Sequence, residues 1–327
     1  YGGNIFEGCS GIKKIIIPEG TVIIKNYAFG SEFTSVTSVS IPNSVTTIGD
    51  NAFYKCSGID SLSIPESVTS IGTYAFSGCS ALKSVKFPNA LTRLGSYSFQ
   101  NCSKLATVQS PDGITGLEEG VFSACSGLVS VNFPASLVTL GKSVFSDCTS
   151  LALLSLPANL NSLGESCFLN CKSLKTLTIP SSLPTINQNA FNGCSGLTSV
   201  QFPTTLSSIG YGAFSNCSGL TTVKIPVYTS VSYSAFTNCK GLLNAVIQYG
   251  YNSGNIFTGC DQLKTITIPT GVSSIPNNAF YNCNTLDTIN IPSSVRTIGQ
   301  SAFYGCSKLK SVLLPKLIQT IPNQCFY

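Results

Sequence analysis

The sequence has 327 residues and no histidine, methionine or tryptophan, and only 9% of its residues are charged, against about 25% in typical domains. The net charge of +5 comes from 16 lysines and 2 arginines against 13 carboxylates, which is too dilute and too poor in arginine to indicate a nucleic-acid groove. Prolines and polar residues interrupt every apolar run well before the roughly 18 residues of a membrane helix, so no membrane span is expected.

A phenylalanine marks one position of a repeat that runs through the chain. From Phe6 to Phe326 there are 14 steps, most of them 23 residues long. The step departs from 23 near residues 29–53 and 236–257, so irregular coils are expected there. A fixed period of this length is typical of repeat architectures. The regularly spaced phenylalanines are Phe53, Phe76, Phe99, Phe122, Phe145, Phe168, Phe191 and Phe214, followed by Phe257, Phe280, Phe303 and Phe326.

Residues 82–104 show how one repeat is built. Residues 85–87 alternate apolar, polar and apolar, which predicts a short half-buried strand. Pro88 then ends the strand, because proline has no N–H for a sheet ladder and its φ is fixed. A second extended stretch follows, and it ends at Gly95. We expect this glycine either to adopt a positive φ or to allow close backbone packing.

A unit of 23 residues cannot bury its own apolar side chains, so successive units must stack to form a core. We therefore expect a mainly β solenoid of about 14 coils that forms one domain over residues 1–327. The strands of successive coils are expected to stack in parallel, about 4.8 Å apart. Because the sequence begins and stops inside a repeat, we also expect it to be part of a longer chain.

Thirteen of the fifteen cysteines follow the marker phenylalanine by three residues and form one ladder. Buried free thiols are the favoured interpretation, because cysteine behaves as a small hydrophobe. Disulfides between coils remain an alternative, although an expected Cβ separation of about 4.8 Å is long for them. A metal site is the other alternative, but a straight row offers no tetrahedral ligand set, so no metal is predicted. The ladder is Cys9, Cys56, Cys79, Cys102, Cys125, Cys148, Cys171, Cys194, Cys217, Cys239, Cys260, Cys283 and Cys306.

The repeat has the pattern L-x-x-[IV]-x-[IFL]-P-x-x-[VL]-x-x-[IL]-G-x-x-[AS]-F-x-x-C, as in IPESVTSIGTYAFSGCSALKSV (64–85) and IPSSVRTIGQSAFYGCSKLKSV (291–312). Over essentially the whole chain this pattern resembles the BspA-like class of leucine-rich repeats. The resemblance implies a right-handed leucine-rich-repeat solenoid, with a parallel sheet on the concave face and extended segments and turns on the convex face. It also implies a surface protein of a host-associated microbe that adheres to matrix proteins or other cells, and it supplies no catalytic residues.

The composition gives little support to catalysis. Without histidine, the commonest general base and the Ser-His and Cys-His pairs are absent. Glu118 and Glu119, with Asp112 nearby, form the only acidic cluster, for which a solvated turn is a better interpretation than a cation site. The glycines recur singly at repeat positions, so no phosphate-binding loop is indicated. We therefore expect neither an enzyme nor a bound cofactor.

Function is then expected on a surface. In each predicted strand one residue points outward between two buried ones, and beside it runs an outward row of mostly serine and threonine. One interpretation is a hydroxyl-rich face that keeps the sheet hydrated; the other is a platform that binds an extended protein or glycan through many shallow contacts. The candidate ligand-binding residues on this concave face are Lys86, Gln109, Asn132, Thr178, Gln201, Lys224, Thr267 and Asn290.

The sequence therefore favours a non-enzymatic adhesion or protein-interaction module. It is expected outside the cell, bound to a protein or glycan on a host or neighbouring cell. A structural subunit that stacks end to end into an extracellular filament is the alternative, because head-to-tail contacts propagate. An intracellular interaction scaffold is a further alternative, since free cysteines favour a reducing compartment.

Overall fold

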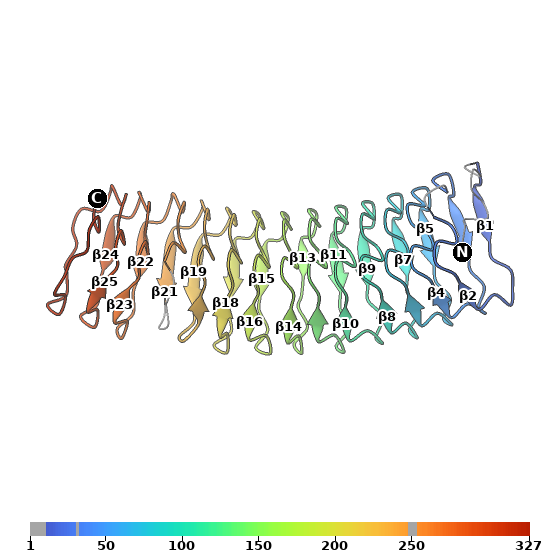
Figure 1. Ribbon diagram of the computed structural model, residues 1–327, viewed down its shortest axis with the longest axis horizontal. Helices are drawn as coiled ribbons and strands as arrows, with labels where there is room; N and C mark the ends of the chain where they lie inside the picture. The colour runs from blue at the N-terminus through green and yellow to red at the C-terminus, as the bar shows by residue number, and fades with distance from the viewer. Residues whose placement is uncertain (1–10, 31–32, 248–253) are drawn as a thin grey trace. The chain divides into compact units, whose positions relative to one another are not determined.

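The computed structural model describes residues 11–30, 33–247 and 254–327. The chain divides into two compact units, Tyr1–Cys171 (unit 1) and Lys172–Tyr327 (unit 2). Each unit is a stack of coils built from short strands, and the described residues contain no helix (Figure 1). An apolar helix long enough to cross a membrane is accordingly not found among them. Cys9 and part of the coil expected to be irregular near 236–257 lie outside the described residues.

The strands of unit 1 form two rows. The first row is the strand predicted before each proline, and the second row is the extended stretch after it. The first-row strands are β1 (Lys14–Ile16), β3 (Ser38–Ser40), β5 (Ser61–Ser63), β7 (Ser84–Lys86), β9 (Thr107–Gln109), β11 (Ser130–Asn132) and β13 (Leu153–Leu154). The second-row strands are β2 (Ile23–Ile24), β4 (Thr47–Ile48), β6 (Ser70–Ile71), β8 (Arg93–Leu94), β10 (Gly116–Leu117), β12 (Thr139–Leu140) and β14 (Ser162–Leu163).

Unit 2 has the same two rows. Its first-row strands are β15 (Thr176–Thr178), β17 (Ser199–Gln201), β19 (Thr222–Ile225), β21 (Asn244–Ile247), β22 (Thr265–Thr267) and β24 (Thr288–Asn290). Its second-row strands are β16 (Thr185–Ile186), β18 (Ser208–Ile209), β20 (Ser230–Val231), β23 (Ser274–Ile275) and β25 (Thr297–Ile298).

Neighbouring coils pair in parallel and in register, so equal repeat positions face one another. Val131 of β11 lies opposite Val108 of β9, and Ile209 of β18 lies opposite Ile186 of β16. The predicted parallel β-solenoid is confirmed. Among the described residues twelve coils contain both strands, slightly fewer than the 14 coils expected. The difference arises because the coil of β21 has no second-row strand within the described range and the last coil keeps only a bridge at Val312.

Proline closes the first-row strand and opens a tight turn, as predicted. The N–H of Val68 donates to the carbonyl oxygen of Pro65 over 3.0 Å, and the N–H of Leu91 donates to that of Pro88 over 3.2 Å. This three-residue hydrogen bond reverses the chain immediately after the strand. Proline is suited to the first position of this turn because that residue only accepts a hydrogen bond through its carbonyl oxygen and needs no N–H to donate.

Two positions in each coil adopt the left-handed backbone conformation, two residues before and two residues after the marker phenylalanine. For Phe99 these are Tyr97 (φ 58°) and Asn101 (φ 60°). Asparagine and glycine tolerate this conformation best, which explains why they recur at the second position. Its occupants include Gly78, Asn170, Gly193, Asn216, Asn238, Gly259, Asn282 and Gly305.

The glycine that follows the second-row strand is required for close packing instead. A Cβ added at Gly95 would lie 2.6 Å from the carbonyl carbon of Gly72 in the preceding coil, and one at Gly141 would lie 2.8 Å from the carbonyl oxygen of Leu117. Neither Gly95 nor Gly141 has a positive φ. Of the two reasons expected for this glycine, close packing is right and the positive φ is wrong.

The marker phenylalanines form the centre of the core in each unit. The rings of Phe53 and Phe76 stack at 5.1 Å and 6°, and those of Phe214 and Phe236 at 5.3 Å and 5°. In the coil that lacks a ladder cysteine, the side chain of Phe33 is buried and packs edge-on against Phe29 at 5.9 Å. A larger ring therefore helps to fill the core where the sulfur is missing.

The ladder cysteines are free thiols, and they donate hydrogen bonds. The sulfur of Cys125 lies 3.1 Å from the carbonyl oxygen of Phe99 in the preceding coil, and that of Cys217 lies 3.3 Å from the carbonyl oxygen of Phe191. The buried-thiol interpretation is confirmed, but the role as donor was not predicted. The same contact is made by Cys56, Cys79, Cys102, Cys148, Cys171, Cys239, Cys260, Cys283 and Cys306. Cys194 is buried as well.

Burial raises the pKa of several of these thiols. It raises the pKa of Cys56 and of Cys306 to about 12, and that of Cys79 and Cys217 well above the ordinary value of 9.0. Because the thiolate is the nucleophile and the metal ligand, such sulfurs are chemically inert at neutral pH. The structural role of the ladder stays a prediction.

Candidate functional site

The eight predicted ligand-binding residues all lie on the outward face of first-row strands, and all are exposed. In β9 and β15 the outer two residues are exposed and the middle one is buried, which is the alternation expected of a strand that covers a core. The structure thus confirms the direction in which these side chains point. Their role in binding stays a prediction.

In-register pairing brings some of these residues side by side. Neighbouring strands of a sheet lie about 4.8 Å apart, so in-register residues on adjacent parallel strands place their side chains next to each other. The pairs formed are Gln109 with Asn132 in unit 1, and Thr178 with Gln201 and Thr267 with Asn290 in unit 2.

The two lysines of the set differ in their surroundings. The ammonium group of Lys86 lies 4.0 Å from the carboxylate of Glu66, so its charge is partly neutralised. Lys224 lies on β19 opposite Val246 of β21 and forms no ion pair with any described residue. Lys224 therefore offers a free positive charge on this face, whereas Lys86 offers much less.

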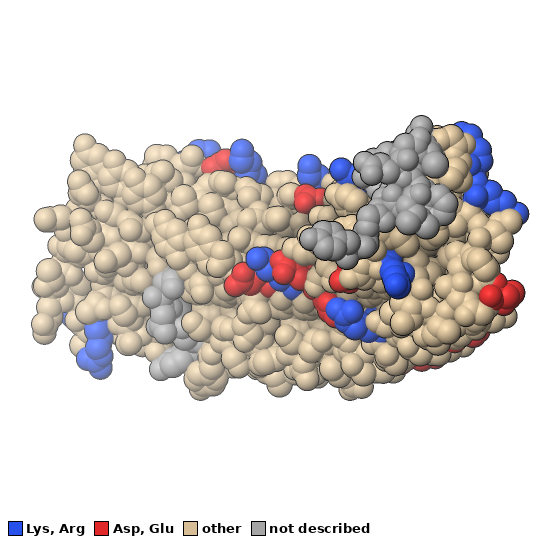
Figure 2. Space-filling model, turned by 45° about the vertical axis from the view of Figure 1, so that its right-hand side comes forward, with Lys and Arg blue, Asp and Glu red and all other residues tan. Residues whose placement is uncertain are grey.

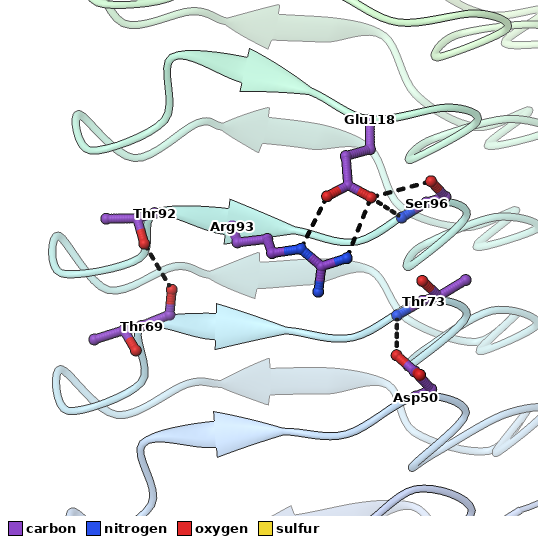
Figure 3. Close-up of polar contacts among 7 residues, drawn as sticks. All are labelled: Asp50, Thr69, Thr73, Thr92, Arg93, Ser96 and Glu118. Carbon is purple, nitrogen blue, oxygen red and sulfur yellow. Dashed lines mark hydrogen bonds and ion pairs between the residues drawn. The ribbon is translucent and has the colours of Figure 1, made fainter.

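A charged cluster that the sequence did not predict lies at the second row of unit 1. The Glu118 carboxylate accepts hydrogen bonds from the Arg93 guanidinium at 2.9 and 3.4 Å, and from the N–H and hydroxyl of Ser96 at 2.9 and 3.1 Å (Figure 3). Arg93 and Ser96 belong to the coil before Glu118. The interpretation of Glu118 as part of a solvated turn is therefore incomplete, because its carboxylate fastens two coils together.

Glu119 extends the cluster. Its carboxylate accepts a hydrogen bond from the Tyr97 hydroxyl at 2.7 Å and lies 3.8 Å from the Lys142 ammonium group. Partial burial and this hydrogen bond raise the pKa of Tyr97 to about 12, so the phenol stays neutral. Figure 2 shows such groups of acidic and basic side chains on a surface that is otherwise mostly uncharged.

The cluster coincides with a break in both strand rows. In unit 1, β8 ends one sheet and β10 begins the next, and β7 and β9 likewise belong to separate sheets. Glu118 occupies the position at which most coils have the closely packed glycine. The rings of Phe99 and Phe122 at this step are 5.9 Å apart and tilted by 25°, against 5.1 Å and 6° for Phe53 and Phe76. We attribute the widened step to the missing glycine.

The described residues do not assemble a site for metal chemistry. Nowhere within them do three or more Cys, Asp or Glu side chains come together in a way that could hold a metal ion. The thiols of Cys56, Cys79, Cys102 and Cys217 are buried, and the carboxylates of the cluster are engaged with Arg93, Ser96, Tyr97 and Lys142.

These features define a leucine-rich-repeat solenoid. The family described as "BspA type Leucine rich repeat region (6 copies)" matches residues 2–129, 117–243 and 252–327, and the chain belongs to this family. The predicted resemblance is therefore confirmed. No curated protein matches the sequence.

Three solved structures are similar to this chain. A leucine-rich repeat protein from Bacteroides ovatus is 29% identical with a TM-score of 0.73, and the match covers 94% of this chain and 76% of that one. A leucine rich cell surface protein from Faecalibacterium prausnitzii is also 29% identical with a TM-score of 0.55, covering 92% and 87%. A leucine-rich repeat protein from Eubacterium ventriosum, 19% identical with a TM-score of 0.55 and coverage of 96% and 88%, shows the fold alone.

Proposed function

We propose that this chain is a non-enzymatic interaction module on the surface of a microbial cell, where its first-row face binds an extended protein or glycan on a host or neighbouring cell. The family is one of repeat proteins that serve protein interaction. The similar chain from Faecalibacterium prausnitzii is described as a cell surface protein, which supports the same location for this one.

The observation that carries the proposal is the first-row face itself. Its eight candidate residues are exposed, polar and held in register by backbone ladders. A ligand therefore meets side chains whose backbone is already ordered, and this lowers the entropic cost of binding. Contacts spread along a row suit an extended ligand better than a compact one.

We further infer that residues 1–327 are one repeat domain. Phe168 and Phe191, on either side of the boundary between the units, keep the regular spacing of 23 residues, which supports this reading. End-to-end assembly and an intracellular scaffold role stay predictions, because no observation favours either of them.

Two measurements test the proposed function. The first is binding of the purified chain to an array of immobilised extracellular-matrix proteins and glycans, where we expect saturable binding to at least one of them. The second is brief protease treatment of intact cells that express this protein, where we expect the repeat region to be released. Absence of binding across the array, together with protection from protease, contradicts the proposal.

A further inference from the structure

Positive charge is concentrated in unit 2. Unit 1 contains nine lysines and arginines against eleven carboxylates, a net charge of −2, whereas unit 2 contains nine against two, a net charge of +7. All four ion pairs among the described residues lie in unit 1. Every lysine and arginine of unit 2 lies within the described residues, and none has a carboxylate partner. The net charge of the whole chain conceals this asymmetry.

Most of these cations occupy one segment of the coil. We define the lysine edge as the unit 2 segments that run from each ladder cysteine to the end of the next first-row strand, or to Val312 in the last coil. Seven of the nine cations lie on it, and all seven are exposed. Only Asp261 and Asp287 oppose them there. The seven are Lys172, Lys175, Lys224, Lys240, Lys264, Lys308 and Lys310.

Backbone hydrogen bonds align this edge from coil to coil. The N–H of Lys264 donates to the carbonyl oxygen of Leu243 over 2.9 Å, that of Asp287 to Lys264 over 3.4 Å, and that of Lys310 to Asp287 over 3.5 Å. Lys264 and Lys310 are thus two coil steps apart, about 10 Å at the usual strand spacing. The lysine edge is therefore an ordered row of charges along unit 2.

We propose that the lysine edge binds an extended acidic polysaccharide, with the carboxylate or sulfate groups of the sugar placed on the lysine ammonium groups. This inference rests on the proposed function and names the class of its ligand. The edge also contains the exposed residues Thr222, Thr265 and Thr288, whose hydroxyls can form hydrogen bonds with those of a sugar chain. Free ammonium groups arranged in a row attract a linear polyanion more strongly than the same charges spread over a sphere.

The chemistry of the edge disfavours nucleic acid. It contains no arginine, the residue that reads guanine and phosphate with paired hydrogen bonds. It also presents no outward aromatic ring on which bases could stack. The nearest phenylalanine in its coils, Phe202, follows the edge at the end of β17, is half-buried and packs edge-on against Phe214 at 5.5 Å.

The test uses the full chain, immobilised heparin as a sulfated probe and polygalacturonate as a carboxylated one. The variant Lys264→Gln/Lys310→Gln removes two charges of the edge. The matched control Arg296→Gln/Lys316→Gln removes two exposed charges of unit 2 that lie off the edge. Both variants have a net charge of +3, so a difference between them reports position and not total charge. Far-UV circular dichroism and a thermal melt check that both are folded.

We expect at least one of the two polysaccharides to bind at about 0.15 M salt, with affinity that falls steeply as salt increases. The edge variant is expected to bind roughly tenfold more weakly, and the control within twofold of the unaltered chain. Binding to neither polysaccharide, or equal loss in both variants, overturns the inference. So does tighter binding to duplex DNA or to anionic phospholipid vesicles that depends on Lys264 and Lys310.

Failure of this inference can be told apart from failure of the proposed function. If the chain binds a protein on the matrix array but neither polysaccharide, the lysine edge is not a polysaccharide site and the interaction module stands. If it binds nothing on the array and neither polysaccharide, both proposals fall.

Discussion

The thiol of Cys125 and the carbonyl group of Phe99, in consecutive coils of unit 1, are joined by a hydrogen bond of 3.1 Å. This hydrogen bond explains why cysteine recurs at this repeat position, which hydrophobicity alone does not explain. The same oxygen accepts the N–H of Cys102 over 3.4 Å, so the thiol is its second and shorter donor, and each such hydrogen bond in a packed core contributes to stability. A thiol fills the volume of a small apolar side chain and also supplies the donor.

Replacement of Cys125 by valine should destabilise the chain by about 1 kcal/mol, although valine is apolar and of similar size, because the Phe99 carbonyl loses the shorter of its two hydrogen bonds and keeps only that from the Cys102 N–H. Replacement by serine should cost less, since the hydroxyl can donate to the same oxygen. The measurement is the shift of the urea midpoint for each variant. If the valine variant matches the unaltered chain and the serine variant is the weaker one, the thiol acts only as a hydrophobe.

Stability should fall in alkaline solution. Burial raises the pKa of Cys56 and Cys306 to about 12, whereas an unfolded thiol titrates near 9.0. Between these values the unfolded chain loses thiol protons that the folded chain retains, so the free energy of unfolding decreases as pH rises above 9. Each such thiol contributes up to about 1.4 kcal/mol per pH unit. Below pH 9 this contribution is fully present.

Urea midpoints at pH 8, 9, 10 and 11 test this dependence. A Cys79→Ser/Cys102→Ser variant serves as the control, because it lacks two of the buried thiols whose pKa is raised. Its stability should fall less steeply with pH than that of the unaltered chain. Equal slopes would show that lysine and tyrosine titration accounts for the alkaline loss.

An alanine at Gly95 should be severely destabilising. Its Cβ would lie 2.6 Å from backbone atoms of Gly72 and Thr73, which cannot move without disturbing the coil. We expect a loss of roughly 3 kcal/mol or more, in the range of overpacked cores. Gly11→Ala is the control, because no atom lies within 4 Å of its added Cβ. Thermal melts should show a large shift for Gly95→Ala alone; similar melts for both would refute close packing as the role of this glycine.

Neutralisation of Glu118 should loosen the step between the coils of Phe99 and Phe122. Glu118→Gln keeps the size of the side chain but removes the charge that holds Arg93 and Ser96. The ion pair is partly exposed, so we expect a modest loss of about 1 kcal/mol that shrinks in high salt. Glu165→Gln, on an exposed carboxylate, should change little. Amide hydrogen exchange of residues 93–119 measures the effect. Unchanged exchange in Glu118→Gln would show that the cluster does not stabilise the contact between these two coils.

The repeat spacing was enough to predict the fold and the direction of most side chains. One period places Val85 inward, Lys86 outward and Pro88 in the turn, and the same assignment applies in every coil. The left-handed position two residues after phenylalanine was also detectable, because asparagine, aspartate and glycine recur there. It was missed because these residues are common throughout this sequence.

The charged cluster and the lysine edge could not be predicted in the same way. Arg93 and Glu118 are 25 residues apart and occupy different repeat positions, so only the coordinates show that their side chains meet. The lysine edge exists because unit 2 has few carboxylates, and the net charge of the whole chain does not show how unevenly the carboxylates are distributed. The thiol donor escaped prediction because the sequence does not show that the phenylalanine carbonyl of the preceding coil lies within reach of the sulfur.

The most direct test of the account compares two variants for binding to a ligand found on the matrix array. In one, Gln109, Asn132, Gln201 and Asn290 of the first-row face are changed to alanine. In the other, the exposed second-row residues Thr139, Asn161, Ser162 and Ser230 are changed to alanine. We predict at least about tenfold weaker binding for the first variant and an unchanged affinity for the second. Full affinity in the first variant, or a loss confined to the second, would contradict the assignment of binding to the first-row face.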